Sequence, residues 1–220
     1  MVVFINDKKV RFKTRGASID LAGFQKVVFG TMPLDKGVLK GHVAIIDASQ
    51  ANIHLFIKLI EEEKLKKLQS VTFFMENKNR AKAYFKKYFK QIKAGGGIVE
   101  KGNKILLIYR NNKWDIPKGK LESGELIEAC SQREVEEETA VIVKRRELIT
   151  KTYHTYLKKD RRVLKKNYWY RMECVDDSAM KPQLDEGITD IKWMTKEESL
   201  EAVQDSFASI KQLLKKYYKL

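Results

Sequence analysis

Residues 119–141 read GKLESGELIEACSQREVEEETAV, and this stretch decides the fold of the chain. Its second half is rich in strong helix formers and predicts an α-helix. At about 100° per residue, Glu134, Glu137 and Glu138 share one face of that helix. Three like charges on one face repel one another, and a bound cation removes the repulsion. Carboxylate oxygens favour a hard cation such as Mg²⁺ or Mn²⁺ over zinc.

A longer pattern surrounds these glutamates. It consists of Gly119, then Glu125, then Arg133-Glu134-Val135, Glu137-Glu138 and Val141. This pattern resembles the Nudix box at eight of nine positions, and the exception is Ala140, where the family has glycine. At average residue usage, the six matched Gly, Glu and Arg positions would arise by chance on the order of once in 10⁵ chains of this length. The alternative, a solvated glutamate-rich helix face, explains neither Gly119 nor Arg133.

The departure from the pattern at Ala140 has a physical cost. Directly after the helix, the family's glycine would serve as a C-terminal cap in the left-handed region, and alanine forced into that region costs about 1 kcal/mol. The helix either carries this cost or ends in a different way. Because Ala140 contributes no metal ligand, we expect a modest loss of stability and no loss of chemistry.

The residues around the box predict further elements of the same fold. Strands are expected over 94–99 and 104–110, before the segment WDIPKGK at 114–120, and again over 141–157, 163–175 and 191–194. Residues 195–198 resemble a capping box that opens the C-terminal helices. This order of elements is similar to a Nudix domain. The resemblance implies an α/β fold, an α/β/α sandwich with a mixed sheet.

The chain is longer than one Nudix domain of about 130 residues. Residues 1–93 are therefore expected to form a small α/β N-terminal domain before a Nudix domain at 94–220. In the first part, strands are expected over 2–5, 10–13, 42–47 and 71–75, and helices over 53–68 and 79–92. This part contains no site motif, so its role is left open.

Positive charge is concentrated in the first domain. Residues 1–93 carry 19 Lys and Arg against 8 Asp and Glu, whereas residues 94–220 carry 25 against 21, so +11 of the net charge of +15 lies in the first part. A cationic surface raises the local concentration of polyanions, which include RNA and free nucleotides. The alternative is an ordinary solvated lysine-rich surface. RNA is kept as a partner of the basic domain, and a homodimer is also left open.

Cysteine content and hydropathy indicate the compartment. Cys130 and Cys174 do not form a CxxC pair, and a disulfide framework is not expected. The first residues lack the basic start and the apolar core of a signal peptide, and no run approaches the roughly 18 apolar residues of a membrane span. The three histidines are scattered and do not suggest a zinc site. We expect a cytoplasmic protein that does not bind membranes.

The Nudix resemblance implies a metal-dependent hydrolysis. Nudix enzymes cleave a nucleoside diphosphate linked to another moiety by attack of water on one phosphorus of the pyrophosphate bridge. Divalent ions neutralise the phosphates and activate the water. By resemblance, the metal ligands are Glu134, Glu137 and Glu138, and a backbone carbonyl near Lys118 or Gly119 completes the shell.

The resemblance also implies supporting residues and a general base. Arg133 and Glu125 match positions whose side chains pair and hold the loop against the helix. The base is expected from the helix or from the later loop at residues 182–188, where many family members carry an acidic residue that faces the metals. Glu186 is the first candidate and Asp185 the second. The alternative is that both are exposed loop carboxylates.

Substrate-binding residues are expected on the strands after the box and beside the metal site. Alternation over residues 164–170 gives one face with Lys166, Tyr168 and Tyr170, and another with Lys165, Asn167 and Trp169. One of these faces is expected to line the cleft. We select Lys166, Tyr168 and Tyr170 as contacts for a phosphate and a base, with core packing as the alternative. Arg110 and Lys118 flank the metal site and are candidates for phosphate contacts.

Three functions are compatible with these residues. The first is a pyrophosphohydrolase of small nucleotides such as dinucleoside polyphosphates, nucleoside triphosphates or nucleotide sugars. The second is an RNA 5′-end pyrophosphohydrolase, similar to the decapping members of the family, in which the basic domain holds the strand. The third is a catalytically silent Nudix module that senses a ligand. The complete set of helix glutamates argues against the third, and the sequence favours the first.

Overall fold

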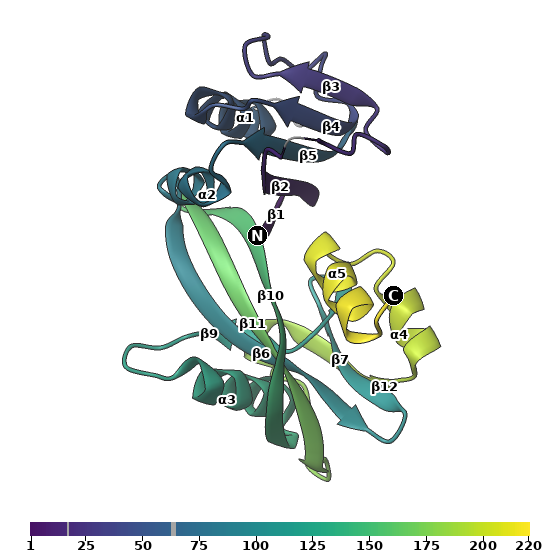
Figure 1. The fold of residues 1–220 in the computed structure, drawn as a ribbon. Coiled ribbons are helices and arrows are strands. Elements are labelled where there is room, and N and C mark those ends of the chain that lie inside the picture. Colours follow the sequence, from purple (N-terminus) through teal and green to yellow (C-terminus); the bar gives the residue numbers. More distant parts are fainter. Residues whose placement is uncertain (17, 63–64) are drawn as a thin grey trace. The chain divides into compact units, whose positions relative to one another are not determined.

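The computed structural model describes residues 1–16, 18–62 and 65–220. These residues form two compact units, whose elements are labelled in Figure 1. Unit 1 comprises residues 1–91 and 153–164, and unit 2 comprises residues 92–152 and 165–220. The sequence predicts a single boundary near residue 93, whereas the structure also assigns the segment 153–164 to unit 1.

Unit 1 is built on a mixed sheet packed with helices. Its elements are β1 (Val2–Ile5), β2 (Lys8–Thr14), β3 (Lys26–Phe29), β4 (Gly41–Ile46), α1 (Gln50–Glu62), β5 (Leu68–Met75) and α2 (Lys78–Lys86). The strand order is β1-β2-β5-β4-β3. β1 and β2 pair antiparallel, whereas β2, β5, β4 and β3 pair parallel. The segment 153–164 joins this sheet because Val3 of β1 is in register with Tyr153.

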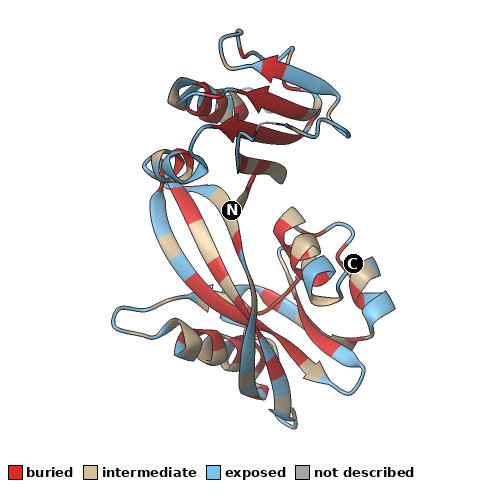
Figure 2. Cartoon of the chain, viewed as in Figure 1, coloured by how far each residue is buried: buried red, intermediate tan, exposed pale blue. Residues whose placement is uncertain are grey.

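Alternation along the strands gives the sheet of unit 1 an apolar face. Val10 and Phe12 of β2 lie beside Val71 and Phe73 of β5, and all four are buried. Figure 2 shows β4 and β5 mainly in the colour of buried residues. α1 packs onto this face through Phe56, whose ring meets that of Phe73 edge-on at a centroid distance of 5.5 Å. The opposite face of β2 and β5 carries mainly polar and charged residues.

The two helices predicted in this part end earlier in the structure. The first is predicted over 53–68, but α1 spans Gln50–Glu62, and residues 63 and 64 lie outside the described residues. The second is predicted over 79–92, but α2 ends at Lys86. Phe85 lies in α2 and Phe89 lies beyond its end, yet both are buried. The apolar pattern with helical spacing therefore extends beyond the helix itself. An amphipathic pattern reports burial, and it does not show where the backbone leaves the helix.

Unit 2 contains the segment that decides the fold. Its elements are β6 (Lys90–Lys101), β7 (Lys104–Arg110), β8 (Lys113–Asp115), β9 (Lys118–Lys120), α3 (Ile127–Thr139), β10 (Ile142–Lys158), β11 (Arg161–Asp176), the 3₁₀ turn η1 (Leu184–Glu186), β12 (Ile188–Met194), α4 (Lys196–Ala202) and α5 (Ala208–Tyr217). The strand order is β12-β7-β6-β11-β10, with β8 beside β7 and β9 beside β6. The first residues of β6, the last residues of β10 and the first residues of β11 belong to unit 1.

Helices cover both faces of the sheet in unit 2. Along β7, Leu106 joins a core that includes Val135 of α3, and Leu107 joins a separate core that includes Ile210 of α5. Figure 1 shows α3 on one side of these strands and α4 with α5 on the other. The predicted capping box is present, because the Thr195 side chain accepts from the backbone of Glu198 and the Glu198 side chain accepts in return. In the part of the chain that the structure describes, no helix combines the length and the apolar composition needed to cross a membrane.

Candidate active site

The strand before α3 brings residue 119 against the helix. Gly119 lies in β9, and the carboxylate of Glu134 fills the space beside its α-carbon. A β-carbon built at residue 119 would overlap Oε2 of Glu134. Gly119 does not have a positive φ, so this close approach is what requires glycine. Burial raises the pKa of Glu134.

Arg133 contacts three carboxylates, one in the loop before α3 and two on α3 itself. Its Nε and Nη2 donate to Oε1 and Oε2 of Glu125 at 2.8 and 3.0 Å. Its Nη1 lies 2.8 Å from Oε2 of Glu137 and 3.0 Å from Oε1 of Glu134. The hydrogen bonds from Arg133 lower the pKa of Glu125 to about 2. Glu125 also accepts the backbone N–H of Glu122 at 3.0 Å, so the ion pair fastens the preceding loop to α3.

Glu138 is the most buried of the three glutamates on this helix face, with 2% of its surface exposed. Its Oε2 accepts the backbone N–H of Lys118 at 2.7 Å, and its Oε1 accepts Nη1 of Arg110 at 3.2 Å. Burial raises the pKa of Glu138 to about 7, while the positive charge of Lys118 acts in the opposite direction. The second terminal nitrogen of Arg110 lies 3.0 Å from Oε2 of Glu186. Arg110 therefore joins the helix carboxylate to the later loop.

The loop that carries Glu186 is tied to the end of α3 by backbone hydrogen bonds. The N–H of Gln183 donates to the carbonyl of Glu138 at 3.2 Å. The N–H of Lys181 donates to the carbonyl of Thr139 at 3.0 Å. These bonds hold the loop beside the helix end, and the ion pair with Arg110 then fixes the side chain of Glu186 near the same site.

A lysine on the strand face that the sequence analysis did not select also interacts with this site. Lys165 of β11 is partly buried and interacts electrostatically with Lys118 and Glu138. Burial, followed by the charge of Lys118, lowers the pKa of Lys165 to about 8. The side chain of Lys118 itself forms an ion pair with Asp115, which is 4% exposed. Strand alternation is the signal that separates Lys165 from its neighbours, but alternation does not say which face lines the site.

One known family accounts for the chain from β6 to α5. A family model described as the NUDIX domain matches residues 90–215, which is more than half of the chain. The chain belongs to the NUDIX family. The predicted family and the predicted fold, an α/β/α sandwich preceded by a further α/β region, are confirmed.

Individual NUDIX relatives cover different shares of the chain. An ADP-ribose pyrophosphatase from Methanocaldococcus jannaschii is 39% identical over 77 residues, which are 33% of this chain and 46% of the relative. The chain thus spans about half the length of that relative. An Ap4A hydrolase binary complex from C. elegans is 21% identical over 58% of this chain and 96% of that chain, with a TM-score of 0.45. A NUDIX hydrolase from Nitrosomonas europaea is 21% identical over 59% and 90%, with a TM-score of 0.48.

The other face of β11 in the NUDIX domain is directed toward α3. Tyr170 is buried, and its hydroxyl donates to Oε1 of Glu128 at 3.0 Å. The Nζ of Lys166 lies 4.4 Å from the ring centroid of Tyr168. Tyr168 is partly buried against the core that includes Val135. Tyr170 thus has the packing role that the sequence left open as its alternative, while Lys166 and Tyr168 lie at the margin of this core.

Helix α3 ends where the NUDIX pattern has glycine. Ala140 adopts φ 53° and ψ 23°, in the left-handed region, and its N–H donates to the carbonyl of Glu136 at 2.8 Å. The helix therefore keeps the cap geometry of glycine with an alanine in place, and it carries the conformational cost instead of ending in a different way.

The three helix glutamates form an oxygen donor set, as the NUDIX family's general use of divalent ions requires. Within the described ranges 1–16, 18–62 and 65–220, no group of three or more His, Cys, Asp or Glu side chains is already gathered as a metal site. Glu134 and Glu137 both contact Nη1 of Arg133, whereas Glu138 accepts the backbone N–H of Lys118. The chemistry of the donors fits a hard divalent ion, and binding requires these side chains to turn toward it.

Proposed function

We propose that this chain is a divalent-metal-dependent pyrophosphohydrolase that cleaves a nucleoside diphosphate linked to another moiety by attack of water on the pyrophosphate bridge. The observation that carries the proposal is the distribution of charge around Glu138. Arg110 pairs with this buried carboxylate on α3, Lys118 donates its backbone N–H to it, and the charges of Lys118 and Lys165 interact with it electrostatically. Hydrolysis of a pyrophosphate needs carboxylates for metal ions and cations for phosphate oxygens, and both lie side by side here.

The metal is proposed to be Mg²⁺ or Mn²⁺. The proposed ligands are Glu134, Glu137, Glu138 and the backbone carbonyl of Gly119. An ion bound there would neutralise phosphate charge and lower the pKa of the attacking water. Arg133 and Glu125 are proposed as positioning residues, because their paired hydrogen bonds hold the loop of the box against α3.

The chain's own cations are proposed to bind and orient the phosphates. Arg110 pairs with Glu138, Lys165 interacts electrostatically with the same carboxylate, and Lys118 precedes the proposed carbonyl ligand in the chain. Partial burial strengthens the attraction of these cations for a phosphate, because less water screens it. Lys166 and Tyr168 are proposed as contacts for the rest of the nucleotide, whereas Tyr170 is held in the core and by Glu128.

Glu186 is proposed as the general base. Its carboxylate pairs with Arg110, and Arg110 also pairs with Glu138. A single arginine side chain therefore connects Glu186 to the glutamate face of α3. A base must lie within hydrogen-bond reach of the water from which it takes the proton. The exposed carboxylate of Glu186, held by Arg110, supports this assignment.

The substrate class is a nucleoside diphosphate joined to a sugar or to a further phosphate chain. The similarity to a protein named ADP-ribose pyrophosphatase supports the nucleotide-sugar members of this class. Dinucleoside polyphosphates and nucleoside triphosphates contain the same phosphoanhydride bond and belong to the same test.

The proposal is tested with the purified full chain, Mg²⁺ or Mn²⁺, and a panel of nucleotides that contains ADP-ribose, dinucleoside polyphosphates, nucleoside triphosphates and 5′-triphosphate RNA. We expect release of a nucleoside monophosphate or pyrophosphate from at least one small nucleotide. Glu138→Gln is expected to lower turnover by several orders of magnitude with the fold intact, and EDTA is expected to abolish it.

Glu136→Gln is the matched control on the same helix. Glu136 accepts the backbone N–H of Val143 at 3.1 Å, and the amide oxygen of glutamine can accept the same bond. Full activity is expected for this variant. Equal activity in Glu138→Gln and Glu136→Gln, or no metal-dependent hydrolysis of any nucleotide, would refute the proposed function.

A second candidate, pyrophosphate removal from an RNA 5′ end, is favoured by the charge of residues 1–93, which carry 19 Lys and Arg against 8 Asp and Glu. This candidate predicts that RNA is hydrolysed faster than any small nucleotide and that its KM rises steeply with salt concentration. Weak salt dependence, or a preference for small nucleotides, would rule out the RNA candidate in favour of small-nucleotide hydrolysis.

A further inference from the structure

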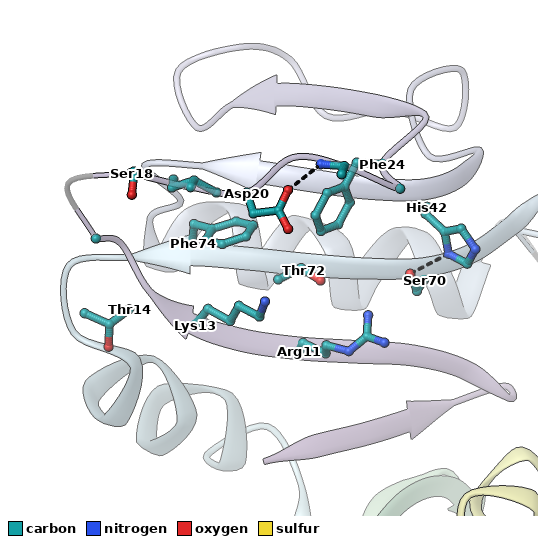
Figure 3. Close-up of a pocket in the computed structure, with 14 residues that line it drawn as sticks. Arg11, Lys13, Thr14, Ser18, Asp20, Phe24, His42, Ser70, Thr72 and Phe74 are labelled. Atoms are coloured by element: carbon teal, nitrogen blue, oxygen red, sulfur yellow. Dashed lines mark hydrogen bonds between the residues drawn. The ribbon is translucent and has the colours of Figure 1, made fainter. Parts of the chain in front are cut away.

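The polar face of the sheet in unit 1 contains a pocket of about 620 Å³. Figure 3 shows it between β2, β5 and the segment that carries Asp20 and Phe24. The cations Arg11 and Lys13 line it, together with Ser70 and Thr72. Small-molecule sites commonly have volumes of about 300–1,000 Å³, so this pocket has the size of a site for one small ligand.

Strand register places two cations beside a row of β5 side chains. Arg11 is in register with Thr72, and Lys13 is in register with Phe74. Alternation puts these residues on the face opposite the apolar core. Because Arg11 and Lys13 are two residues apart on one strand, their backbone positions are separated by about 6.6–6.8 Å. Figure 3 shows both side chains extending from β2 toward β5.

Thr72 brings a buried hydroxyl to the same place. The residue is 0% exposed, and its Oγ1 has no hydrogen-bond partner among the described residues. A buried hydroxyl without a partner is costly, and such groups in native proteins call for an explanation. A bound acceptor in the pocket would supply the missing hydrogen bond.

Arg11 is not engaged by a carboxylate of any described residue. It has no ion pair in the part of the chain that the structure describes, and burial lowers its pKa. The carboxylate of Asp20, which also lines the pocket, accepts the backbone N–H of Ala22 at 2.9 Å. The cations on β2 therefore share the pocket with one acidic residue, whose carboxylate accepts a hydrogen bond from its own loop.

An aromatic wall closes another side of the pocket. The rings of Phe24 and Phe74 meet edge-on at a centroid distance of 6.1 Å. The Nζ of Lys13 lies 5.6 Å from the centroid of the Phe74 ring. The pocket thus offers an apolar surface directly beside its positive charge.

We propose that this pocket binds a small phosphorylated molecule of about mononucleotide size. Arg11 and Lys13 bind the phosphate, the Thr72 hydroxyl donates to one of its oxygens, and the organic part packs against Phe24 and Phe74. Two cations on either side of a hydroxyl donor match a dianion with several oxygens better than a singly charged carboxylate. The site lies in unit 1, is separate from the glutamates of α3, and goes beyond the proposed hydrolysis.

The proposal is tested by calorimetric titration of the full chain with AMP, inorganic phosphate and adenosine in EDTA. AMP contains no pyrophosphate bond, and EDTA removes divalent ions from the NUDIX domain. We expect AMP to bind, phosphate to compete with it, and adenosine to bind at least roughly tenfold more weakly than AMP, because it lacks the charged group.

Variants then place the binding in this pocket. Arg11→Gln and Thr72→Val are each expected to weaken AMP binding by roughly tenfold or more. Thr72→Val should melt at the same temperature or higher, because it removes the hydroxyl that lacks a partner. Lys26→Gln is the charge control, since Lys26 is in register with Val43 on the opposite face of the sheet. Lys26→Gln and Glu138→Gln should both bind AMP like the wild type.

Several results would overturn the proposal. These are no binding of either AMP or phosphate at millimolar concentration, unchanged AMP binding in both pocket variants, an equal loss in Lys26→Gln, and equal binding of adenosine and AMP. Binding of single-stranded RNA that mononucleotides do not displace, and that Arg11→Gln weakens, would assign the face to RNA and also overturn it.

Discussion

The carboxylate of Glu134 occupies the space in which a β-carbon of residue 119 would lie. Gly119→Ala must therefore displace a proposed metal ligand. We expect kcat to fall by roughly 100-fold, the size of effect that a displacement of about 1 Å produces in a catalytic site. Circular dichroism should show an unchanged fold. Gly102→Ala is the control for kcat, because nothing lies within 4 Å of a β-carbon at that residue. Its φ of +58° makes alanine cost about 1 kcal/mol of stability there, but kcat should stay at the wild-type value. Equal losses in the two variants would contradict this role of Gly119.

The bridge from Glu138 through Arg110 to Glu186 predicts a loss of turnover in Glu186→Gln. Loss of a general base typically costs about 10²–10⁴-fold, and we expect kcat to fall within this range while KM changes little. Steady-state kinetics on the identified substrate provide the measurement. Asp185→Asn, one residue earlier in η1, should retain turnover. Full turnover in Glu186→Gln would remove this residue from the mechanism.

The position of Lys165 predicts that β11 contributes phosphate binding through this residue. Lys165→Met keeps the apolar part of the side chain and removes the charge, and we expect KM to rise by roughly tenfold, as for loss of one charge-assisted hydrogen bond. Lys166→Met tests the other face of the same strand and should have the smaller effect. A larger rise of KM in Lys166→Met would assign the cleft to the face with Tyr168.

The left-handed backbone at Ala140 predicts a stabilising substitution. Ala140→Gly should raise the free energy of unfolding by about 1 kcal/mol, because glycine adopts this conformation without strain. Urea denaturation measures the change, and activity should stay the same. Ala129→Gly, at an exposed position within α3, is the matched control and should destabilise by about 1 kcal/mol. The same sign in both variants would contradict the strain at Ala140.

The ion pair between Arg133 and Glu125 predicts a pH dependence of stability. The pKa of Glu125 is lowered to about 2 in the folded chain, below its ordinary value of about 4.3 in an unfolded chain. Its contribution to stability is therefore complete above about pH 4.3 and is lost as the pH falls toward 2. The difference in unfolding free energy between the wild type and Glu125→Gln should shrink between about pH 6 and about pH 3.

Chemical denaturation in metal-free buffer measures this difference at each pH. Glu122→Gln leaves the side-chain pair between Glu125 and Arg133 in place, so this control should follow the wild type. A difference between the wild type and Glu125→Gln that does not change with pH would show that the ion pair does not depress the pKa of Glu125.

The local part of the site follows from sequence spacing. Helical periodicity places Glu134, Glu137 and Glu138 on one face, and the structure has all three in α3. The pair of Arg133 and Glu125 is also present as the resemblance implies. These relations span few residues and depend on one helix and its preceding loop, so short-range patterns are sufficient to predict them.

Relations between distant strands do not follow from the sequence in this way. Alternation separates Lys165 from Lys166, but only the packing of β11 against its neighbours shows which of them lies beside Glu138. The short edge strand β3, Lys26–Phe29, is likewise missed, because its four residues, although rich in strand formers, are too few to show an alternating pattern. Non-local pairing, which decides both cases, leaves little trace in a window of a few residues.

The assignment of residues 153–164 to unit 1 has a consequence for truncation. The backbone passes between the units at residues 91/92, 152/153 and 164/165, so unit 1 is not one continuous piece of chain. Leu164 is 2% exposed within the core of unit 1, and removal of residues 1–91 would leave it in water. Such a fragment is expected to aggregate. Point substitutions are therefore the sound way to separate the roles of the two units, because a simple deletion would damage both.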